Sequence, residues 1–303
     1  MPVELDSDVL ARTVTSRSRV SQHKLRSALR TLRSVWRLGN GLVAARRHRA
    51  LTKVLDHPDT AAFGQRHPKV RYKYLFNYAA KNLTTKQRHA LLAGHYRTVQ
   101  AQLSARQLTA ILDNRLPIWR GSAPDTPLSI HLGFPAAVQT EGDLCVTMKI
   151  GQLEMYRIVF ILAGGALFGL EARPVIFITC IQGLASQLHM RAAKDVCCDV
   201  HPADMLMAAL DGVARVLGVV TIAGIATANQ VAHKHGFKFS YEAFFEQYGA
   251  RAHGASQTML IAAPLTHKQI ALVASKRRKR STAKREFRDA VGASAAAALL
   301  AAA

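Results

Sequence analysis

Residues 141–150 read Glu-Gly-Asp-Leu-Cys-Val-Thr-Met-Lys-Ile, and this stretch decides the fold class. A turn at Glu141-Gly142-Asp143 precedes seven residues in which apolar and polar side chains alternate, which is the pattern of a half-buried β-strand. Two further strands are predicted at 155–162 and 175–181, and a short buried strand at 219–226. The second half of the chain therefore contains a β-sheet.

The residues before this sheet, from 56 to about 114, follow a helical pattern instead. Thr84 is the predicted N-cap of a helix that runs through Val99, and Ser104 is the predicted N-cap of a second helix that ends at Leu112. Ser and Thr favour that position because the hydroxyl oxygen accepts a hydrogen bond from a free amide of the first turn. The first half is therefore predicted to be helical.

Turn residues separate the predicted elements of the second half. Prolines and glycines mark turns from Pro117 onward, and Gly164-Gly165 predicts a closely packed hairpin turn. A helix is predicted after His201-Pro202 with its end at Gly218, and a polar helix is expected to start at Asn229. The sequence thus predicts an α+β fold, in which an N-terminal helical region precedes a mixed sheet with packed helices.

The charge of the chain is concentrated at its two ends. The 303 residues include 41 Lys and Arg against 19 Asp and Glu, a net charge of +22. Residues 1–53 hold 12 basic and 3 acidic groups, and residues 276–303 hold 8 and 2. The two ends therefore supply 15 of the 22 charges, and we expect them to meet an anionic partner, either nucleic acid or a membrane surface.

Residues 22–38 form the clearest amphipathic helix of the sequence. Its apolar stripe ends at Trp36, and its second stripe consists of four arginines, Arg26, Arg30, Arg33 and Arg37. Three interpretations stay open: a helix docked on its own core, a helix lying on anionic lipid, or a nucleic-acid arm. The other end carries a second candidate for an anionic surface, Lys276, Arg277, Arg278, Lys279 and Arg280.

Composition excludes several classes of protein, among them collagens, disulfide-rich secreted modules and acidic disordered chains. Four cysteines are too few for a disulfide framework, so we expect a reduced cytoplasmic protein that contacts the inner membrane peripherally at most. No run of about 18 apolar residues occurs, and no transmembrane segment is predicted. The adjacent Cys197 and Cys198 lack the spacing of zinc ligands, and we predict neither a metal nor a cofactor.

Polar residues cluster just after the predicted strand ends between Val175 and Phe239. Open α/β sheets place ligand sites at such strand ends. The cluster supplies an amide, a cation and imidazoles that titrate near neutral pH. The ligand-binding candidates are Gln182, Gly183, Lys194, His201, Asn229 and His233. The alternative is that these residues cap helices and line turns.

Seven short pieces, in order over residues 66–250, resemble the VirK/YbjX family of bacterial proteins. The pieces are His95-Tyr96, Glu141-Gly142-Asp143-Leu144, Tyr156 with Phe160, Ile176-Phe177-Ile178 before Gln182-Gly183, Lys194, His201-Pro202, and Tyr241-Glu242-Ala243-Phe244-Phe245. The resemblance implies a role in envelope or stress physiology, including virulence-related resistance to cationic peptides. It implies no reaction.

A second likeness is to the GNAT-type acetyltransferase superfamily. The order strand, loop, helix and strand, followed by Asn229-x-x-Ala232 and Gly236-Phe237, is similar to the second half of that fold. It implies an acyl or aminoacyl transferase using acyl-CoA, although the acyl-CoA phosphate loop is missing after Ile181. A third alternative is nonspecific nucleic-acid binding through the basic ends. Whether the chain is an enzyme stays open.

Three parts of the chain are expected. Residues 1–55 form a basic amphipathic arm, and residues 56–262 form the VirK/YbjX-like domain, with a helical part at 56–115 and a sheet part at 116–262. Residues 263–303 form a basic, alanine-rich tail. We expect this tail to be disordered or a frayed helix because it has no apolar core of its own.

Overall fold

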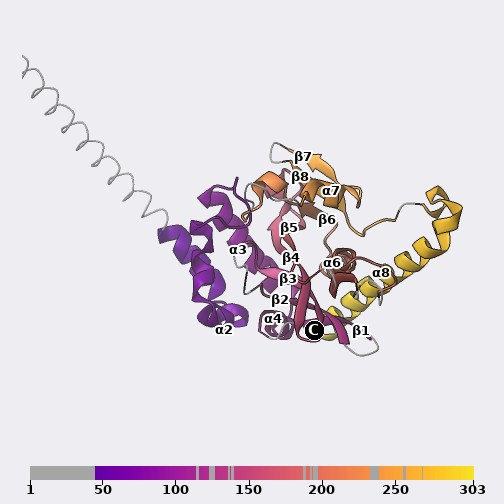
Figure 1. Cartoon of the computed structure of the whole chain (residues 1–303). Helices are drawn as coiled ribbons and strands as arrows, with labels where there is room; N and C mark the ends of the chain where they lie inside the picture. Colours follow the sequence, from indigo (N-terminus) through magenta and orange to yellow (C-terminus); the bar gives the residue numbers. More distant parts are fainter. Residues whose placement is uncertain are drawn as a thin grey trace, which may run out of the picture. The chain divides into compact units, whose positions relative to one another are not determined.

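The structure is a computed structural model that describes residues 45–113, 116–122, 127–135, 137, 140–186, 189–191, 193, 197–232, 239–254, 257–267 and 269–303 (Figure 1). The chain divides into two units, residues 1–50 and residues 51–303. In the first unit, residues 45–50 are helical. The predicted amphipathic helix at 22–38, with its four arginines, lies outside the described residues.

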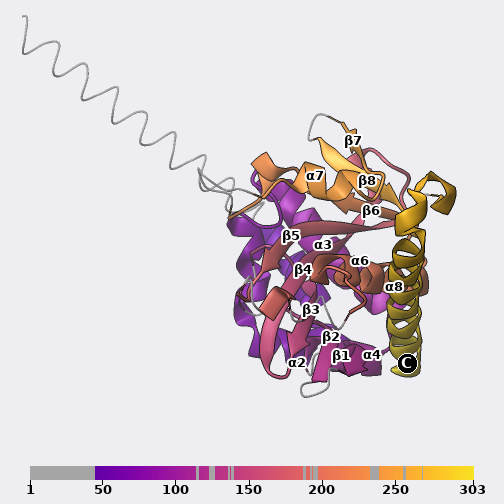
Figure 2. The same ribbon diagram turned by 45° about the vertical axis from the view of Figure 1, so that its right-hand side comes forward.

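The described strands of the second unit form one mixed sheet of eight strands in the order β1-β2-β3-β4-β5-β6-β8-β7 (Figure 2). All neighbouring strands are antiparallel except β5 and β6, which are parallel. The strands are β1 (Leu116–Ser122), β2 (Pro127–Gly133), β3 (Leu144–Ile150), β4 (Leu153–Gly164), β5 (Pro174–Gly183), β6 (Thr221–Gly224), β7 (Arg251–His253) and β8 (Thr258–Ala262). The predicted α+β class is confirmed.

The alternating stretch quoted first is β3, with the predicted bounds. The next two predicted strands are β4 and β5, each longer than expected, and they form a hairpin around the short helix η2 (Gly165–Phe168). Gly165 allows this tight turn because a Cβ there would lie 2.0 Å from the carbonyl oxygen of Glu171. The predicted turn at Gly164-Gly165 is therefore confirmed.

The segment after Pro117 contains two strands, β1 and β2, where the sequence indicated only turns. Proline has no amide hydrogen, so it disfavours a strand interior. Here Pro117 lies in the edge strand of the sheet, at a point where the register with β2 shifts. An edge position and a bulge both tolerate a missing donor, which explains why the turn signal misled.

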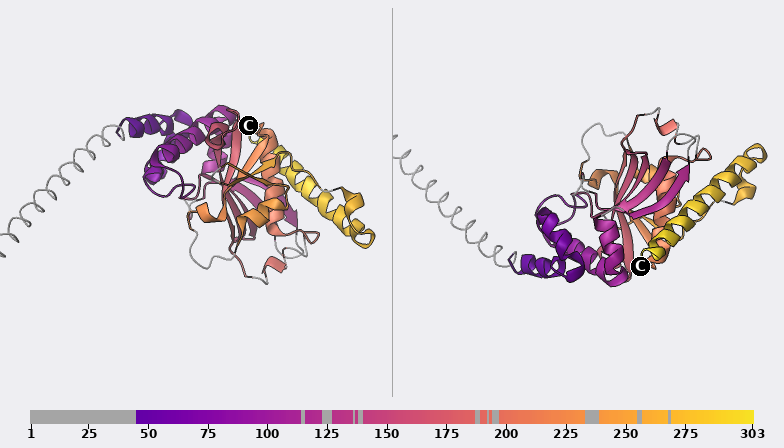
Figure 3. Two further views of the ribbon diagram at one scale, coloured as in Figure 1. Left: turned by 90° about the horizontal axis from the view of Figure 1, so that it is seen from above. Right: turned by 90° about the horizontal axis from the view of Figure 1, so that it is seen from below.

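The predicted helical region covers one face of the sheet, and α3 packs against β4 (Figure 3). It consists of α2 (Pro58–Arg66), η1 (Pro68–Leu75), α3 (Thr85–Gln102) and α4 (Ala105–Leu112). Thr84 and Ser104 cap α3 and α4 as predicted, each in a capping box with the glutamine three residues later. These two helix starts were therefore readable from sequence.

The opposite face carries α6 (Pro202–Val216), which connects the parallel strands β5 and β6 (Figure 3). The prediction of a helix after His201-Pro202 is confirmed. The expected helix start at Asn229 is wrong, because Asn229 is the last residue of a single short turn, η3 (Thr227–Asn229). The next described helix is α7 (Tyr241–Glu246).

The tail, which was expected to be disordered or a frayed helix, forms the packed helix α8 (Ser275–Ala301). Its second half packs against α6 and β1, and the buried side chains there are Val291, Ala295 and Leu299. The hydroxyl of Ser294 donates a hydrogen bond to the carbonyl of Ile118 over 3.3 Å, and the Phe287 ring lies 6.1 Å from that of Trp119. Small side chains allow this close approach, so the alanine-rich composition that suggested disorder is an adaptation to packing.

Candidate functional site

The parallel strands β5 and β6 pair only briefly and then separate. Their last register pair is Ile178 with Gly224, and one further hydrogen bond of 3.0 Å joins the Ile225 amide to the Ile178 carbonyl. Beyond it, the Ile181 amide donates over 3.1 Å to the Tyr241 hydroxyl from α7. Ligand sites in open α/β sheets lie where neighbouring parallel strands diverge at their carboxyl ends. We call this region the strand separation.

The position of Tyr241 is set by contacts between η3 and α7. Its own amide donates to the Thr227 hydroxyl over 2.9 Å, and the Thr227 amide donates to the Glu242 carboxylate over 2.7 Å. The hydroxyl of Thr227 donates to the same carboxylate. These contacts hold the start of α7 against the turn that follows β6, so Tyr241 is presented to β5.

A buried polar cluster lies at the strand separation. The Glu141 carboxylate accepts a hydrogen bond of 2.8 Å at Oε1 from the Gln230 side-chain amide, and the Thr179 hydroxyl donates to the Glu141 carbonyl. Glu141 is 4% exposed and Gln230 is 2% exposed. Among the described residues, Glu141 Oε2 and Gln230 Oε1 have no hydrogen-bond partner. Buried acceptors are normally satisfied, so these two oxygens lack a donor that a water or a ligand would supply.

The neighbouring thiol and phenol in this cluster are neutral. Burial raises the pKa of the Cys180 thiol, and the adjacent Glu141 carboxylate raises it further. Burial also raises the pKa of Tyr241, and the adjacent Cys180 adds to that shift. A thiol with a raised pKa is a poor nucleophile. The Glu141 carboxylate is therefore the group in this cluster suited to accept a proton.

One cation borders the cluster from β4. Arg157 is opposite Gln182 in the β4–β5 ladder and is 8% exposed. It donates over 2.8 Å to the carboxylate of Glu154, while its buried Nε has no partner among the described residues. It is also close enough to Cys180 to lower the pKa of that thiol slightly against the effect of burial. A third unsatisfied polar atom thus lies near the strand separation.

A second buried cluster surrounds Asp143 and anchors the same loop. Asp143 accepts at Oδ1 from the Lys73 ammonium over 2.8 Å and from the Tyr96 hydroxyl over 2.9 Å, and at Oδ2 from the Tyr78 hydroxyl. Burial alone would raise the pKa of Asp143, but Lys73, His95 and the hydrogen bonds lower it below the usual value. This cluster ties the loop that carries Glu141 to η1 and α3.

Of the predicted ligand residues, the structure brings Gly183 and His201 beside one ring, that of Tyr156. Gln182 and Gly183 are exposed at the end of β5. His201 caps α6 by accepting from the Ala203 amide over 3.2 Å. Asn229 borders a hollow of about 90 Å³ that Gln182 does not line, and Lys194 and His233 lie outside the described residues. His201 therefore follows the alternative, helix capping.

Sequence reasoning about strand ends did not select Glu141, Gln230 or Tyr241. Glu141 is in a predicted turn. It joins the cluster because the loop before β3 packs against β4 and β5, where the Thr179 hydroxyl donates to the Glu141 carbonyl. Glu141 and Tyr241 both belong to the short pieces that carry the family resemblance. That resemblance was the one signal that pointed to them.

The start of the loop after β5 does not fit the pyrophosphate of coenzyme A. The amides of Leu184 and Ala185 donate to the Met155 carbonyl over 2.9 and 3.4 Å. A phosphate-binding loop needs such amides free to point at the phosphate oxygens. Together with the missing glycine-rich motif, this geometry argues against a nucleotide-bearing donor held at Leu184 and Ala185.

Comparisons with known proteins identify a family, and the structural matches include a distant likeness to an acyltransferase. A protein-family model described as "Protein of unknown function (DUF535)" matches residues 31–296, and DUF535 is the VirK/YbjX family that the sequence resembles. A mutant form of the cAMP-binding acyltransferase from Mycobacterium smegmatis is similar in structure, with 12% sequence identity and a TM-score of 0.33. That match covers 68% of this chain and 60% of that protein. No curated protein matches the sequence.

Among the described helices, none has the length and apolar character needed to cross a membrane.

Proposed function

The chain belongs to the DUF535 family, and we propose that it is a transferase that moves an acyl or aminoacyl group, with Glu141 as the general base. The observation that supports this is the Glu141 carboxylate at the strand separation. One oxygen is held by Gln230, and the other is buried without a partner among the described residues. A base for acyl transfer needs a free oxygen in a fixed position.

In the proposed reaction, the proton of an acceptor amine or hydroxyl moves to Glu141 Oε2 as the acceptor atom bonds to the acyl carbon. The bond from that carbon to the sulfur of a thioester donor then breaks, and the departing thiolate takes the proton from Glu141. Gln230 keeps the carboxylate oriented through both steps. Cys180 stays protonated, so no acyl-cysteine intermediate is expected.

The experiment compares two thioester donors, octanoyl-pantetheine and octanoyl-CoA, with ethanolamine, L-lysine and glycerol as acceptors. Released thiol and acylated acceptor are both measured. Because the Leu184 and Ala185 amides are occupied, we expect the donor without the nucleotide to react at least as fast. Glu141→Gln should lower the rate about 100-fold or more.

Two control variants separate the base from its neighbours. Cys180→Ala should keep the rate within about twofold because the thiol is not the nucleophile. Glu286→Gln, an exposed change on α8, should leave the rate unchanged. A wild-type chain that releases no thiol with any of the three acceptors, or a Glu141→Gln variant as fast as wild type, would refute the transferase.

A second candidate function is attachment to an anionic membrane surface, as expected for a role at the cytoplasmic face of the envelope. The start of α8 supports it. Residues 274–280 are exposed, and Leu272 beside them is 78% exposed. Arg280 pairs with Asp199 and Arg278 donates to two carbonyls. The cations of this segment with no partner among the described residues are Lys276, Arg277 and Lys279. Each contributes about 1 kcal/mol near anionic lipid.

Co-sedimentation with phosphatidylserine and phosphatidylcholine vesicles tests the attachment. Changing Lys276, Arg277 and Lys279 to Gln should weaken binding to the anionic vesicles about tenfold or more, since about 1 kcal/mol is lost per cation. The matched control changes three exposed cations of the helical face, Lys69, Lys86 and Arg97, to Gln. Equal losses in both triple variants, or tight binding to duplex DNA without vesicle binding, would overturn this function.

A further inference from the structure

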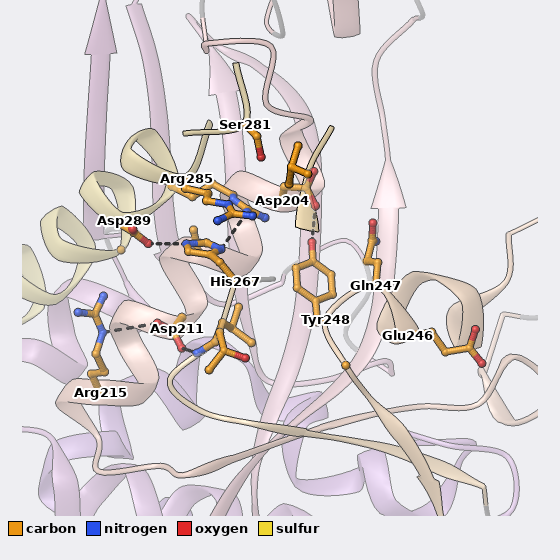
Figure 4. A pocket seen from close by; sticks show the side chains of 17 residues that line it. Asp204, Asp211, Arg215, Glu246, Gln247, Tyr248, His267, Ser281, Arg285 and Asp289 are labelled. Carbon is orange, nitrogen blue, oxygen red and sulfur yellow. Dashed lines mark hydrogen bonds and ion pairs between the residues drawn. The ribbon is translucent and has the colours of Figure 1, made fainter. Parts of the chain in front are cut away.

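A cavity of about 430 Å³, formed by residues other than those at the strand separation, lies between α6 and α8 (Figure 4). The two helices touch at Gly212 and Gly292, where a Cβ on Gly212 would lie 2.1 Å from the Gly292 carbonyl oxygen. The cavity lies on the N-terminal side of this crossing, and residues 246–249 and 265–267 complete its wall. Its volume is within the range of small-molecule sites.

Most charged side chains of the cavity are already paired with one another. Asp211 accepts from the Leu265 amide over 2.7 Å and lies 3.6 Å from the Arg215 guanidinium. His267 is hydrogen-bonded at Nε2 to Asp289 and at Nδ1 to Arg288, each over 2.9 Å. Figure 4 shows these pairs along one wall. They fix the orientation of the Arg288 guanidinium through the imidazole.

Two charged side chains of opposite sign are left over inside the cavity, while the Glu246 carboxylate, which also has no partner among the described residues, is exposed at the edge and points away from it (Figure 4). Arg285 extends from α8 into the cavity (Figure 4) and has no ion pair or hydrogen bond among the described residues. Beside it, the buried Nε of Arg288 has no partner among them either. Across the cavity, the Asp204 carboxylate accepts only from the neutral Tyr248 hydroxyl in that part of the chain. A cation and an anion therefore line one cavity without counter-ions.

We propose that this cavity binds a small zwitterion, a molecule with an ammonium group and a carboxylate or phosphate group. Its acidic group would pair with the guanidinium of Arg285 and with Nε of Arg288. Its ammonium would pair with Asp204, which keeps the Tyr248 contact. A guanidinium and a carboxylate in one partly buried site favour complementary charges on the ligand, because charge-assisted hydrogen bonds are the strong ones. The proposal is independent of the transferase, since the two sites share no residue.

Calorimetric titration of the full chain tests the charge pattern with defined probes. The zwitterions are L-leucine, γ-aminobutyrate and phosphoethanolamine, which differ in charge spacing and in the acidic group. The single-charge probes are butyrate, ethylamine and inorganic phosphate. We expect at least one zwitterion to bind, and each single-charge probe to bind about tenfold more weakly or worse because one charge-assisted contact is missing.

Variants assign the two ends of the ligand. Arg285→Gln and Asp204→Asn should each weaken binding of the preferred zwitterion about tenfold or more. Arg285→Lys keeps the charge and should restore part of the affinity. Arg97→Gln, an exposed change on α3 that does not line the cavity, is the matched control and should have no effect. Melting temperatures of all variants are measured beside the affinities, since Asp204→Asn also alters the Tyr248 contact.

The outcomes are distinct. Loss of zwitterion affinity in Arg285→Gln at an unchanged melting temperature, with recovery in Arg285→Lys, supports the site. Inorganic phosphate or butyrate binding as tightly as the zwitterions would overturn the role of Asp204. No binding by any probe, or an Arg285→Gln variant that binds like wild type, would overturn the proposal as a whole.

Discussion

Glu141 and Asp143 stand two residues apart in one loop, yet their carboxylates enter two different buried clusters. Asp143 accepts hydrogen bonds at both oxygens and faces the Lys73 ammonium. Glu141 accepts at Oε1 from the Gln230 side-chain amide and lies beside the Cys180 thiol, while its buried Oε2 has no hydrogen-bond partner among the described residues. The first carboxylate anchors the loop, and the second is available for chemistry.

Replacing Gln230 should destabilise the fold measurably. Gln230→Ala removes the donor to Glu141 Oε1 and leaves a buried carboxylate without its hydrogen bond, at a cost of about 1–3 kcal/mol. The measurement is the free energy of unfolding from urea titration. Gln182→Ala is the matched control because Gln182 is exposed, and it should change stability by about 0.5 kcal/mol or less. Equal effects of the two changes would contradict the buried cluster.

His95 should make the fold sensitive to mild acid. Burial lowers the pKa of His95 from 6.5 to about 4, so the unfolded chain binds a proton that the folded chain excludes between these values. The free energy of unfolding is not reduced by His95 above pH 6.5. It falls as the pH drops toward 4, because the unfolded chain takes up the proton first. Between about pH 7.5 and about pH 5 the loss is about 2 kcal/mol.

The matching variant is His95→Gln, which keeps a polar acceptor near the Leu162 amide that His95 now binds over 3.1 Å. Between about pH 7.5 and about pH 5, the free energy of unfolding of this variant should fall by about 2 kcal/mol less than that of the wild type. Urea titrations of both chains at the two pH values give the comparison. An identical pH dependence in both would show that His95 titrates normally in the folded protein.

The crossing of α6 and α8 should not tolerate a methyl group. In Gly212→Ala the new Cβ would meet the Gly292 carbonyl oxygen at 2.1 Å, so the helices must move apart, at a cost of about 1–3 kcal/mol. Gly94→Ala is the control, because Gly94 lies inside α3 with no atom within 4 Å of its added Cβ. It should stabilise the fold by up to about 1 kcal/mol. The melting temperatures of both variants test this prediction. A Gly212→Ala variant with the melting temperature of the wild type would rule out the close crossing.

Substitutions at two adjacent leucines test whether α8 is folded and packed against the rest of the domain. Leu299 is fully buried and Leu300 is 60% exposed. Leu299→Ala should cost about 2–5 kcal/mol through lost burial and a residual cavity, whereas Leu300→Ala should change stability by about 0.5 kcal/mol or less. Chemical denaturation of both variants gives the two values. Two equally small effects would return this segment to the disordered tail that composition suggested.

Much of the fold could be predicted because local rules and tertiary structure agree there. Thr84 and Ser104 cap their helices, and β3 has its predicted bounds, although its first five side chains are all buried. The rules failed where a long-range contact decided the outcome. Pro117 is tolerated because its strand lies at the sheet edge. The second half of α8 is ordered because Val291, Ala295 and Leu299 are buried where it packs against α6 and β1. Neither neighbour can be read from local sequence.

The candidate site was harder to predict because distant segments assemble it. Glu141, Cys180, Gln230 and Tyr241 come from a loop before β3, from β5, from the turn after η3 and from α7. Reasoning from strand ends selected Gln182 and Asn229, which are close in sequence to Cys180 and Gln230 but are not members of the cluster. Spacing along the chain carries no signal for such a cluster.

The packing of α8 on β1 has a consequence for synthesis on the ribosome. The antiparallel strands from β1 to β5 pair with sequential neighbours and can form as they emerge. The edge of β1 then stays open until α8 leaves the exit tunnel, because α8 follows all the described strands in the sequence. We therefore expect a newly made chain that stops before α8 to be a good substrate for chaperones and a seed for aggregation through that uncovered strand.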